Sequence, residues 1–220
     1  MRYKLHPNLR RCVAGDSAIF IDVARSRYFK LSPRDDRALR HLIANEWEAV
    51  DESDELARLR ASNIVEPDNS NPVGESHAVP KPDKELEPAV RRIAPVAFGK
   101  ALRATRHARL LLATNSLANV SNALKERRQA AGTARAGRRL NIGEIRTAFA
   151  YIDLWRGSKD RCLERSIAFA LLGIGEGHSV FPVLGVAEPP FTAHAWAQAE
   201  TTVLNDTLGR VSLYTPILVL

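Results

Sequence analysis

Two short hydrophobic runs with few polar positions lie near the start of the chain, and such runs are typical of strands. The runs are Ala18–Asp22 and Arg27–Leu31, joined by a turn at Val23–Ser26. Further on, the hydrophobic spacing becomes that of short helices, and an apolar pair at Ile64–Val65 predicts one more strand. Strands followed by short helices and a closing strand are typical of a small winged-helix module.

The first helix of this module begins with two recognisable residues. Ser32 is a favourable N-cap, and Pro33 suits the first helical position because the N–H that it lacks has no helical partner there. The apolar face of the helix is formed by Leu39, Leu42 and Ile43. A second helix is predicted at Asp54–Ser62, with Leu56 and Leu59 as its apolar pair.

The composition changes between Asp68 and Pro88, where Asn, Pro, Ser, Gly, Lys and Glu replace almost all large apolar side chains. Such a composition is typical of a flexible linker. The sequence therefore predicts a first domain at residues 1–67, a linker at 68–88 and a second domain at 89–220.

Helical spacing dominates the front of the second domain, and strand spacing dominates its end. Helices are predicted at Ala89–Leu112, Leu117–Ala130, Ile142–Trp155 and Cys162–Leu172, with a loop at 130–139. The strands after them are predicted at Val180–Val186, Phe191–Ala199, Thr202–Asp206 and Val211–Leu220. The fold class expected for the whole chain is α+β.

The bulk composition indicates a protein with a substantial core, since 45% of the 220 residues are hydrophobic. The apolar runs are much shorter than the roughly 20 residues of a membrane span, and residues 1–11 lack the apolar centre of a signal peptide. We therefore expect a cytoplasmic protein. Cys12 and Cys162 are far apart in the sequence, so neither a disulfide scaffold nor a cysteine-based zinc site is predicted.

The formal charge of +7 is concentrated in the middle of the chain, where residues 81–140 carry 14 basic and 4 acidic side chains. This excess could meet nucleic acid, an acidic partner or an acidic peptide, and it could equally be a solvated helix face. The basic stripe consists of Arg91, Arg92, Lys100, Arg103, Arg106 and Arg109.

Cys162 is the first candidate for chemistry. A cysteine attacks as its thiolate, and an ordinary pKa of about 8.5 leaves most of the thiol protonated at neutral pH. Ser158 or Asp160 could cap the following helix and leave Cys162 in its first turn. There the helix dipole favours a negative sulfur, and an unpaired backbone N–H could donate to an oxyanion.

His194 and Asp206 are candidates for the groups that act with this thiol. Alternation along the predicted strand places His194 on one face with Thr192, Trp196 and Gln198. If the chain turns at residues 200–201, Asp206 lies beside His194 or directly across from it. A carboxylate there could hold one ring nitrogen and leave the other to face Cys162, as in a nucleophile, base and orienting group.

Each of these residues alone also has an ordinary structural explanation, because a cysteine can be a packing residue, a strand histidine structural and an aspartate a turn residue. Their order and placement together favour catalysis. Gly173, Gly175 and Gly177 end a helix and do not match a nucleotide-binding loop, so no bound ATP is expected. No other cofactor and no metal are expected either. Cys12 is expected to be packed and His178 to be a turn residue.

The segment CLERSIAFALLG from Cys162, with LGV at 184–186, FTAHAW at 191–196 and Asp206, resembles the transglutaminase-like leader peptidases of lasso-peptide biosynthesis, the B proteins. The resemblance covers about residues 90–220 and implies a papain- or transglutaminase-like domain. It also implies a catalytic triad of Cys162, His194 and Asp206, whose separations of 32 and 12 residues agree with the family. Gln198 stands where the family commonly has an acidic residue.

The front of the chain resembles the PqqD-like peptide-recognition domain, through AIFID at 18–22 and RYFKLS at 27–32. This resemblance implies a winged-helix module that binds a leader peptide as an added strand. The candidate peptide-binding residues are Arg27, Tyr28, Phe29, Lys30, Leu56, Leu59 and Arg60. Tyr28 and Phe29 could equally be ordinary core residues.

The two resemblances together imply a cysteine peptidase that binds and removes the leader of a ribosomally synthesised lasso-peptide precursor. The freed amine would then be cyclised by a separate ATP-dependent, asparagine-synthetase-like partner. Two alternatives remain open at this point. The same triad could transfer its acyl group to an amine, as in a transglutaminase, or a winged helix with an inert triad could bind DNA.

Overall fold

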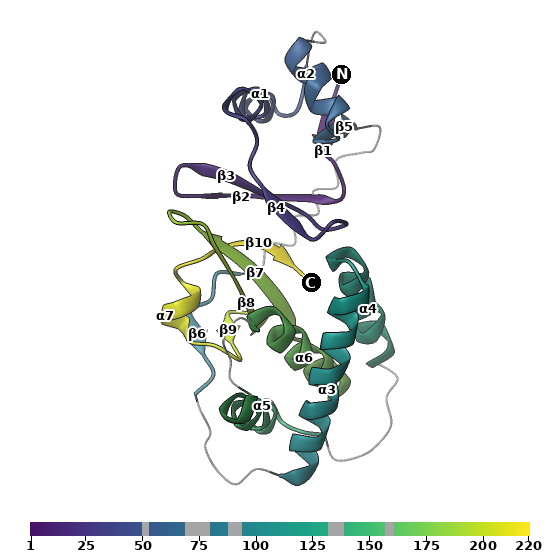
Figure 1. The fold of residues 1–220 in the computed structure, drawn as a ribbon, viewed down its shortest axis with the longest axis vertical. Helices are drawn as coiled ribbons and strands as arrows, with labels where there is room; N and C mark the ends of the chain where they lie inside the picture. The colour runs from purple at the N-terminus through teal and green to yellow at the C-terminus, as the bar shows by residue number, and fades with distance from the viewer. Residues whose placement is uncertain (50–52, 69–79, 88–93, 132–138, 157–160) are drawn as a thin grey trace. The chain divides into compact units, whose positions relative to one another are not determined.

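A computed structural model describes residues 1–49, 53–68, 80–87, 94–131, 139–156 and 161–220, and the backbone contacts divide the chain into two compact units. Unit 1 is Met1–His77 and unit 2 is Ala78–Leu220. The division falls within the segment that the sequence predicts as a linker. Figure 1 shows the elements of both units, coloured from the N-terminus to the C-terminus.

Unit 1 contains a three-stranded antiparallel sheet, a two-stranded sheet and two helices. Its elements are β1 (Tyr3–Leu5), β2 (Leu9–Ala14), β3 (Ser17–Asp22), β4 (Arg27–Phe29), α1 (Pro33–Ala44), α2 (Asp54–Ala61) and β5 (Val65–Pro67). The larger sheet has the order β2-β3-β4, so that β4 is an edge strand, and β1 pairs with β5. The prediction of β3, β4, α1 and α2 is confirmed, whereas β1 and β2 were not predicted.

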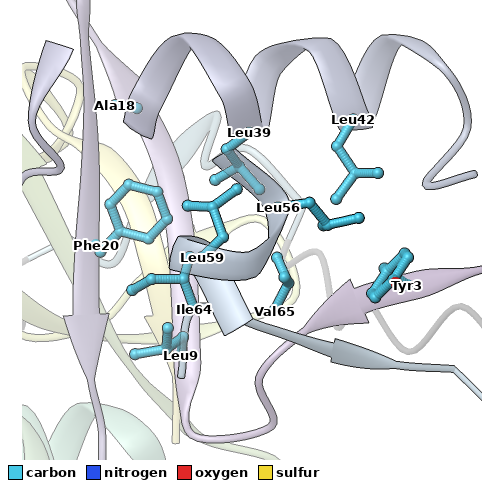
Figure 2. Packing of buried hydrophobic residues seen from close by; sticks show 10 residues of the cluster. All are labelled: Tyr3, Leu9, Ala18, Phe20, Leu39, Leu42, Leu56, Leu59, Ile64 and Val65. Carbon is cyan, nitrogen blue, oxygen red and sulfur yellow. The ribbon is translucent and has the colours of Figure 1, made fainter. Parts of the chain in front are cut away.

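The core of unit 1 forms where α1 and α2 pack on the sheets. Ser32 caps α1 as predicted, since its Oγ accepts a hydrogen bond from the Asp35 N–H at 3.2 Å. Leu39 and Leu42 from α1 meet Leu56 and Leu59 from α2 in a single cluster, which Figure 2 shows together with the strand residues that complete it. Each fully buried leucine contributes about 1.5–3 kcal/mol relative to an exposed one.

Unit 2 combines four long helices, one short helix and a five-stranded sheet among its described residues. Its elements are β6 (Lys84–Glu85), α3 (Pro95–Thr114), α4 (Leu117–Ala131), α5 (Ile142–Arg156), α6 (Cys162–Gly175), β7 (Phe181–Ala187), β8 (Thr192–Ala199), β9 (Thr202–Val203), α7 (Leu208–Val211) and β10 (Thr215–Val219). The sheet has the order β10-β7-β8-β9-β6, and only β6 runs parallel to its neighbour.

Helix α6 is the central element of unit 2. Its residues from Ser166 to Ile174 are all buried, and it packs against α3, α4, α5, β7 and β8. Gly173 allows a close approach, because a Cβ at this position would lie 2.7 Å from Val180 Cγ2. Burial on several sides was predicted for this helix, and it holds the first turn of α6 against β8.

Three predicted boundaries in unit 2 differ from the structure. Strand β9 ends at Val203 and not at Asp206, and the predicted strand Val211–Leu220 is divided between α7 and β10. The C-terminal part of the predicted linker also belongs to unit 2, since β6 pairs with β9 through Lys84 and Glu85. A two-residue strand whose partner lies more than a hundred residues away leaves no local pattern in the sequence.

Candidate active site

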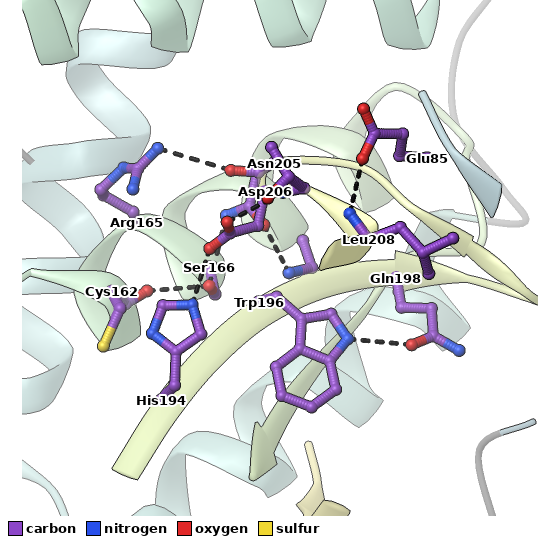
Figure 3. A network of polar contacts seen from close by, with 12 residues as sticks. Glu85, Cys162, Arg165, Ser166, His194, Trp196, Gln198, Asn205, Asp206 and Leu208 are labelled. Carbon is purple, nitrogen blue, oxygen red and sulfur yellow. Dashed lines mark hydrogen bonds and ion pairs between the residues drawn. The ribbon is translucent and has the colours of Figure 1, made fainter. Parts of the chain in front are cut away.

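The three predicted catalytic residues are brought together from three places in unit 2. Cys162 is the first residue of α6, His194 lies on β8, and Asp206 lies between β9 and α7. Figure 3 shows the imidazole of His194 between the sulfur of Cys162 and the carboxylate of Asp206. The geometry thus has the order of nucleophile, base and orienting group.

His194 and Asp206 form a short and buried hydrogen bond. The ring Nε2 and Asp206 Oδ2 are 2.6 Å apart, and the two side chains are only 3% and 9% exposed. Burial opposes ionisation of Asp206, but hydrogen bonds from His194 and from the Thr207 N–H prevail and hold the pKa of this carboxyl below its usual range. Burial likewise opposes the charged imidazole, but Asp206 and Cys162 raise the pKa of His194. The imidazolium form is therefore favoured.

Cys162 is half-buried, and its surroundings favour the thiolate. Burial opposes ionisation, but a hydrogen bond with His194 and the backbone N–H groups of Ala195 and Leu163 lower the pKa of Cys162. The ring nitrogen that faces the sulfur is Nδ1, because Nε2 is bonded to Asp206 (Figure 3). The pair Cys162 and His194 thus has the electrostatics of a thiolate and an imidazolium.

The start of α6 differs from the capping that the sequence predicts. The N-cap residue is Arg161, which makes no capping hydrogen bond with its side chain, and Ser158 and Asp160 lie outside the described residues. Cys162 is nevertheless in the first turn, as expected. The first-turn N–H groups have no partner four residues earlier in the helix, so this turn can donate to a developing oxyanion.

A second set of polar contacts joins α6 to β8 through Asn205. Asn205 Nδ2 donates to Ser166 Oγ at 3.2 Å, and Ser166 Oγ donates to Cys162 O at 2.8 Å. Asn205 Oδ1 accepts from Ala197 N on β8 at 2.7 Å. Sequence reasoning did not select Asn205 or Ser166 as functional residues.

An ion pair fastens α5 to the first turns of α6. Asp153 and Arg165 are joined at 2.6 Å, and both side chains are about four-fifths buried. Arg165 also donates to Asn205 O at 3.5 Å. Burial raises the pKa of Asp153, and the opposing effect of Arg165 is smaller. This pair therefore links α5 to the backbone that precedes Asp206.

Aromatic rings pack around the histidine. The Tyr214 ring centroid lies 5.1 Å from that of His194, and the Trp196 centroid lies at 6.4 Å. Gly185 pairs with His194 across β7 and β8, and a Cβ at Gly185 would lie 2.9 Å from both Trp196 and Tyr214. The absence of a side chain at Gly185 thus leaves room for the Trp196 ring and for the Cβ of Tyr214, whose rings pack beside the base.

The hydrogen bonds of Gln198 explain why an amide stands at the position where the resembled family commonly has an acidic residue. Its Oε1 accepts from Trp196 Nε1 at 2.9 Å, and its Nε2 donates to Pro80 O at 2.7 Å and Glu200 O at 2.6 Å. A carboxylate could accept from Trp196 but could not donate to the two carbonyls. The amide therefore fits this buried position.

The predicted peptide-binding residues of unit 1 do not all have the same environment. Arg27, Tyr28 and Phe29 form the edge strand β4, and Lys30 follows it. Phe29 stacks on Phe20 with 5.3 Å between the ring centroids, as an ordinary core contact would.

The α2 residues differ from the prediction of an accessible face. Leu56 and Leu59 are 5% and 2% exposed, because both pack in the core of unit 1. They form part of the floor of a groove of about 1170 Å³ between α1 and α2. Arg60 is exposed on α2.

Two further residues were assigned no catalytic role. Cys12 is half-buried on β2, and burial raises its pKa to about 11, so its thiol is protonated at neutral pH. His178 Nε2 lies 2.7 Å from Leu140 O, which is a structural contact. Within the described part of the chain, no three His, Cys, Asp or Glu side chains are grouped to hold a metal ion. None of the described helices has the length and apolar composition of a membrane span.

A cysteine at a helix start, a strand histidine and an aspartate thus meet in unit 2 (Figure 3). The family model of the transglutaminase-like superfamily matches residues 102–219, more than half of the chain, and the chain belongs to this superfamily. No curated protein and no solved structure matches the chain. The matched residues include Cys162, His194 and Asp206 and do not include unit 1.

Proposed function

We propose that the chain is a cysteine peptidase that removes the leader from a ribosomally synthesised lasso-peptide precursor. The row of thiol, imidazole and carboxylate carries this proposal, because the ring donates to Asp206 at 2.6 Å while its other nitrogen faces the sulfur (Figure 3). Membership of the transglutaminase-like superfamily supports cysteine-dependent acyl chemistry. The lasso-peptide assignment rests on the sequence resemblance.

The reaction would proceed through a thioester. The Cys162 thiolate attacks the scissile carbonyl, and N–H groups of the first turn of α6 stabilise the oxyanion. The His194 imidazolium protonates the leaving amine, which departs as the new N-terminus of the core peptide. His194 then takes a proton from water, which hydrolyses the thioester to a leader carboxylate and restores the thiol.

Unit 1 would bind the leader in the manner of a PqqD-like domain. An extended leader peptide can add to the edge strand β4, where backbone hydrogen bonds supply affinity and neighbouring side chains supply choice. Arg27, Tyr28, Phe29 and Lys30 are the proposed contacts on β4, and Arg60 is a proposed contact on α2. The freed core would pass to an ATP-dependent, asparagine-synthetase-like cyclase.

The chemistry is tested with candidate lasso-peptide precursors. Wild-type protein should yield two fragments whose summed mass exceeds that of the precursor by one water, and Cys162→Ala should yield none. Cys12→Ala is the matched control and should cleave as wild type does, because the Cys12 thiol is protonated at neutral pH. Unimpaired cleavage by Cys162→Ala would refute the proposal.

Leader recognition is tested with the double charge reversal Arg27→Glu and Lys30→Glu. Lost side-chain contacts with the leader should raise KM by about tenfold and change kcat little, since the reacting groups lie in unit 2. Arg103→Glu on α3 is the control for a charge reversal at an exposed arginine. A fall in kcat at constant KM would contradict binding at β4.

A second reaction is supported by the superfamily match, which spans transglutaminase-like proteins. The same thioester could be attacked by an amine in place of water, which would form an amide. Incubation with precursor and a primary amine distinguishes hydrolysis from acyl transfer, because transfer adds the amine to the acyl fragment and changes the mass of that fragment. An amide product that exceeds the hydrolysis product at millimolar amine would favour the transferase.

A further inference from the structure

The side chain of Asn205 is hydrogen-bonded to both elements that carry the nucleophile and the base. Its Oδ1 accepts from Ala197 N on β8 at 2.7 Å, and its Nδ2 donates to Ser166 Oγ on α6 at 3.2 Å. Ser166 is fully buried and donates to the carbonyl of Cys162 at 2.8 Å. Asn205 also directly precedes Asp206, and Figure 3 shows these side chains meeting beside His194.

The register of β8 and β9 shows why the chain must leave the sheet before Asp206. Gln198 pairs with Val203 and Ala199 pairs with Thr202. The same register continued would place Asp206 opposite Ala195. Residues that pair across two strands point to the same face, and successive residues point to opposite faces, so Asp206 would then face away from His194.

The hydrogen bonds locate this departure at Asn205. Leu204 N still donates to Ala197 O at 2.8 Å, as in a regular antiparallel pair. In such a pair Ala197 N would donate back to Leu204 O, but here it donates to Asn205 Oδ1. The amide side chain therefore replaces a backbone acceptor at the point where the chain turns Asp206 towards His194.

We propose that Asn205, acting together with Ser166, is a positioning residue that holds Asp206 at His194 and fixes the first turn of α6. One amide thereby sets the position of the carboxylate and, through Ser166, that of the Cys162 backbone. Neither side chain is one of the reacting groups. The role of Asn205 in peptide cleavage rests on the proposed function. Its effect on the positions of the thiol and the imidazole does not.

Three variants separate the hydrogen bonds of this residue. Asn205→Ala removes both of them. Asn205→Asp keeps an acceptor for Ala197 N but, as a carboxylate, cannot donate to Ser166. Ser166→Ala removes the contact with Cys162 O and leaves the contact with Ala197 N. The matched control is Thr105→Val, because Thr105 is also buried and also donates to the carbonyl four residues earlier, Ala101 O, at 2.9 Å.

The measurement is the pH dependence of Cys162 alkylation by iodoacetamide, followed by the mass of the peptide that contains Cys162. The charged groups nearest the thiol are His194 on β8 and Asp206; Arg210 on α7 and Arg146 on α5 lie near Asp206, and Glu85 on β6 lies near Arg146. Asn205→Ala should move the midpoint to higher pH by about one unit and slow alkylation by about tenfold at pH values below the midpoint, because less thiolate is present there.

Asn205→Asp and Ser166→Ala should give smaller upward shifts, and Thr105→Val should give none. If Asn205→Ala does not fold, the midpoints of Asn205→Asp and Ser166→Ala test the inference in its place. Unchanged midpoints, whatever the melting temperatures, would overturn the inference, and so would an equal shift in Thr105→Val. Alkylation needs no peptide substrate. A precursor that stays uncleaved in the cleavage assay would therefore contradict the proposed function and leave this inference untouched.

Discussion

At the scale of single residues, Asp206 controls the charge of its neighbour. Hydrogen bonding to Asp206 and Cys162 raises the pKa of His194, and the pKa of Cys162 is lowered. The charged pair requires the pKa of Cys162 to lie below that of His194, and both shifts act to open this pH window. The rate of peptide cleavage should rise as pH passes the pKa of Cys162 and fall as pH passes the pKa of His194.

Asp206→Asn should narrow this window from its alkaline side. A neutral amide no longer stabilises the imidazolium, so the pKa of His194 falls and the alkaline limb moves to lower pH. We expect kcat/KM to drop by at least about 10²-fold, measured as a pH profile of precursor cleavage. Asp206→Glu keeps the charge and should retain the alkaline limb, and a limb that stays in place in Asp206→Asn would contradict the role of this carboxylate.

The sequence was sufficient to select the three residues of the row but not the contacts that bring them together. Their order along the chain and the strand alternation pointed to Cys162, His194 and Asp206. The register alone left Asp206 beside or across from His194, because the departure from the sheet depends on a side chain that replaces a backbone acceptor. Asn205 and Ser166 carry no local pattern that distinguishes them from other polar residues.

At the scale of elements, close packing at the strand pair β7 and β8 depends on the absence of a side chain at Gly185. An added Cβ at Gly185 would meet Trp196 and Tyr214 at 2.9 Å, and both rings pack beside His194. Gly185→Ala should therefore displace these rings, destabilise unit 2 by about 1–3 kcal/mol and reduce cleavage.

Thermal unfolding and activity assays check the effect of Gly185→Ala. Gly99→Ala on α3 is the control, because nothing lies within 4 Å of a Cβ there. Replacing a helical glycine with alanine at an open position should be stabilising, by about 0.5–1 kcal/mol. A Gly185→Ala protein as stable and active as wild type would show that the rings are free to move.

The C-terminal end of α6 is held by Glu176. Its carboxylate is bonded to Lys100 on α3 at 2.6 Å and accepts from Leu140 N at 2.9 Å. Burial opposes ionisation, but these two partners prevail and lower the pKa of Glu176. Because the folded pKa is depressed, the stabilisation is complete at neutral pH and is lost as pH falls through the folded pKa.

Glu176→Gln should lower the free energy of unfolding by about 1–3 kcal/mol at neutral pH, and the difference from wild type should shrink in acid. Denaturant unfolding at several pH values measures this. Glu126→Gln, at an exposed position on α4, should change stability little at any pH. A pH-independent difference for Glu176→Gln would exclude the carboxylate as its cause.

Several short elements were not predicted from the sequence, and neither was the six-residue strand β2. Strands β1 and β6 have three and two residues, and α7 has four. Such segments are defined by partners that are distant in the chain, so local hydrophobic spacing does not reveal them. The helices α4, α5 and α6 and the main strands β7 and β8 were predicted within about three residues of their observed ends, whereas the predicted start of α3 at Ala89 lies outside the described residues.

At the scale of the whole molecule, the two units have separate cores and separate proposed tasks. If unit 1 binds the leader at β4, a synthetic leader peptide should slow backbone hydrogen exchange in β3 and β4 of the full chain, because bound strands open less often. Exchange in α6 should not change. Mass spectrometry of peptide fragments measures both, and a scrambled leader is the control. Protection confined to α6 would place the leader site in unit 2.

The short contact between Nε2 of His194 and Oδ2 of Asp206 has a spectroscopic consequence. The proton between these atoms is charge-assisted and shielded from solvent, since both side chains are nearly buried. It should exchange slowly enough with water to give a resolved low-field proton NMR signal that vanishes in Asp206→Ala. Its shift with pH would then report the titration of the neighbouring sulfur directly, before any natural substrate is in hand.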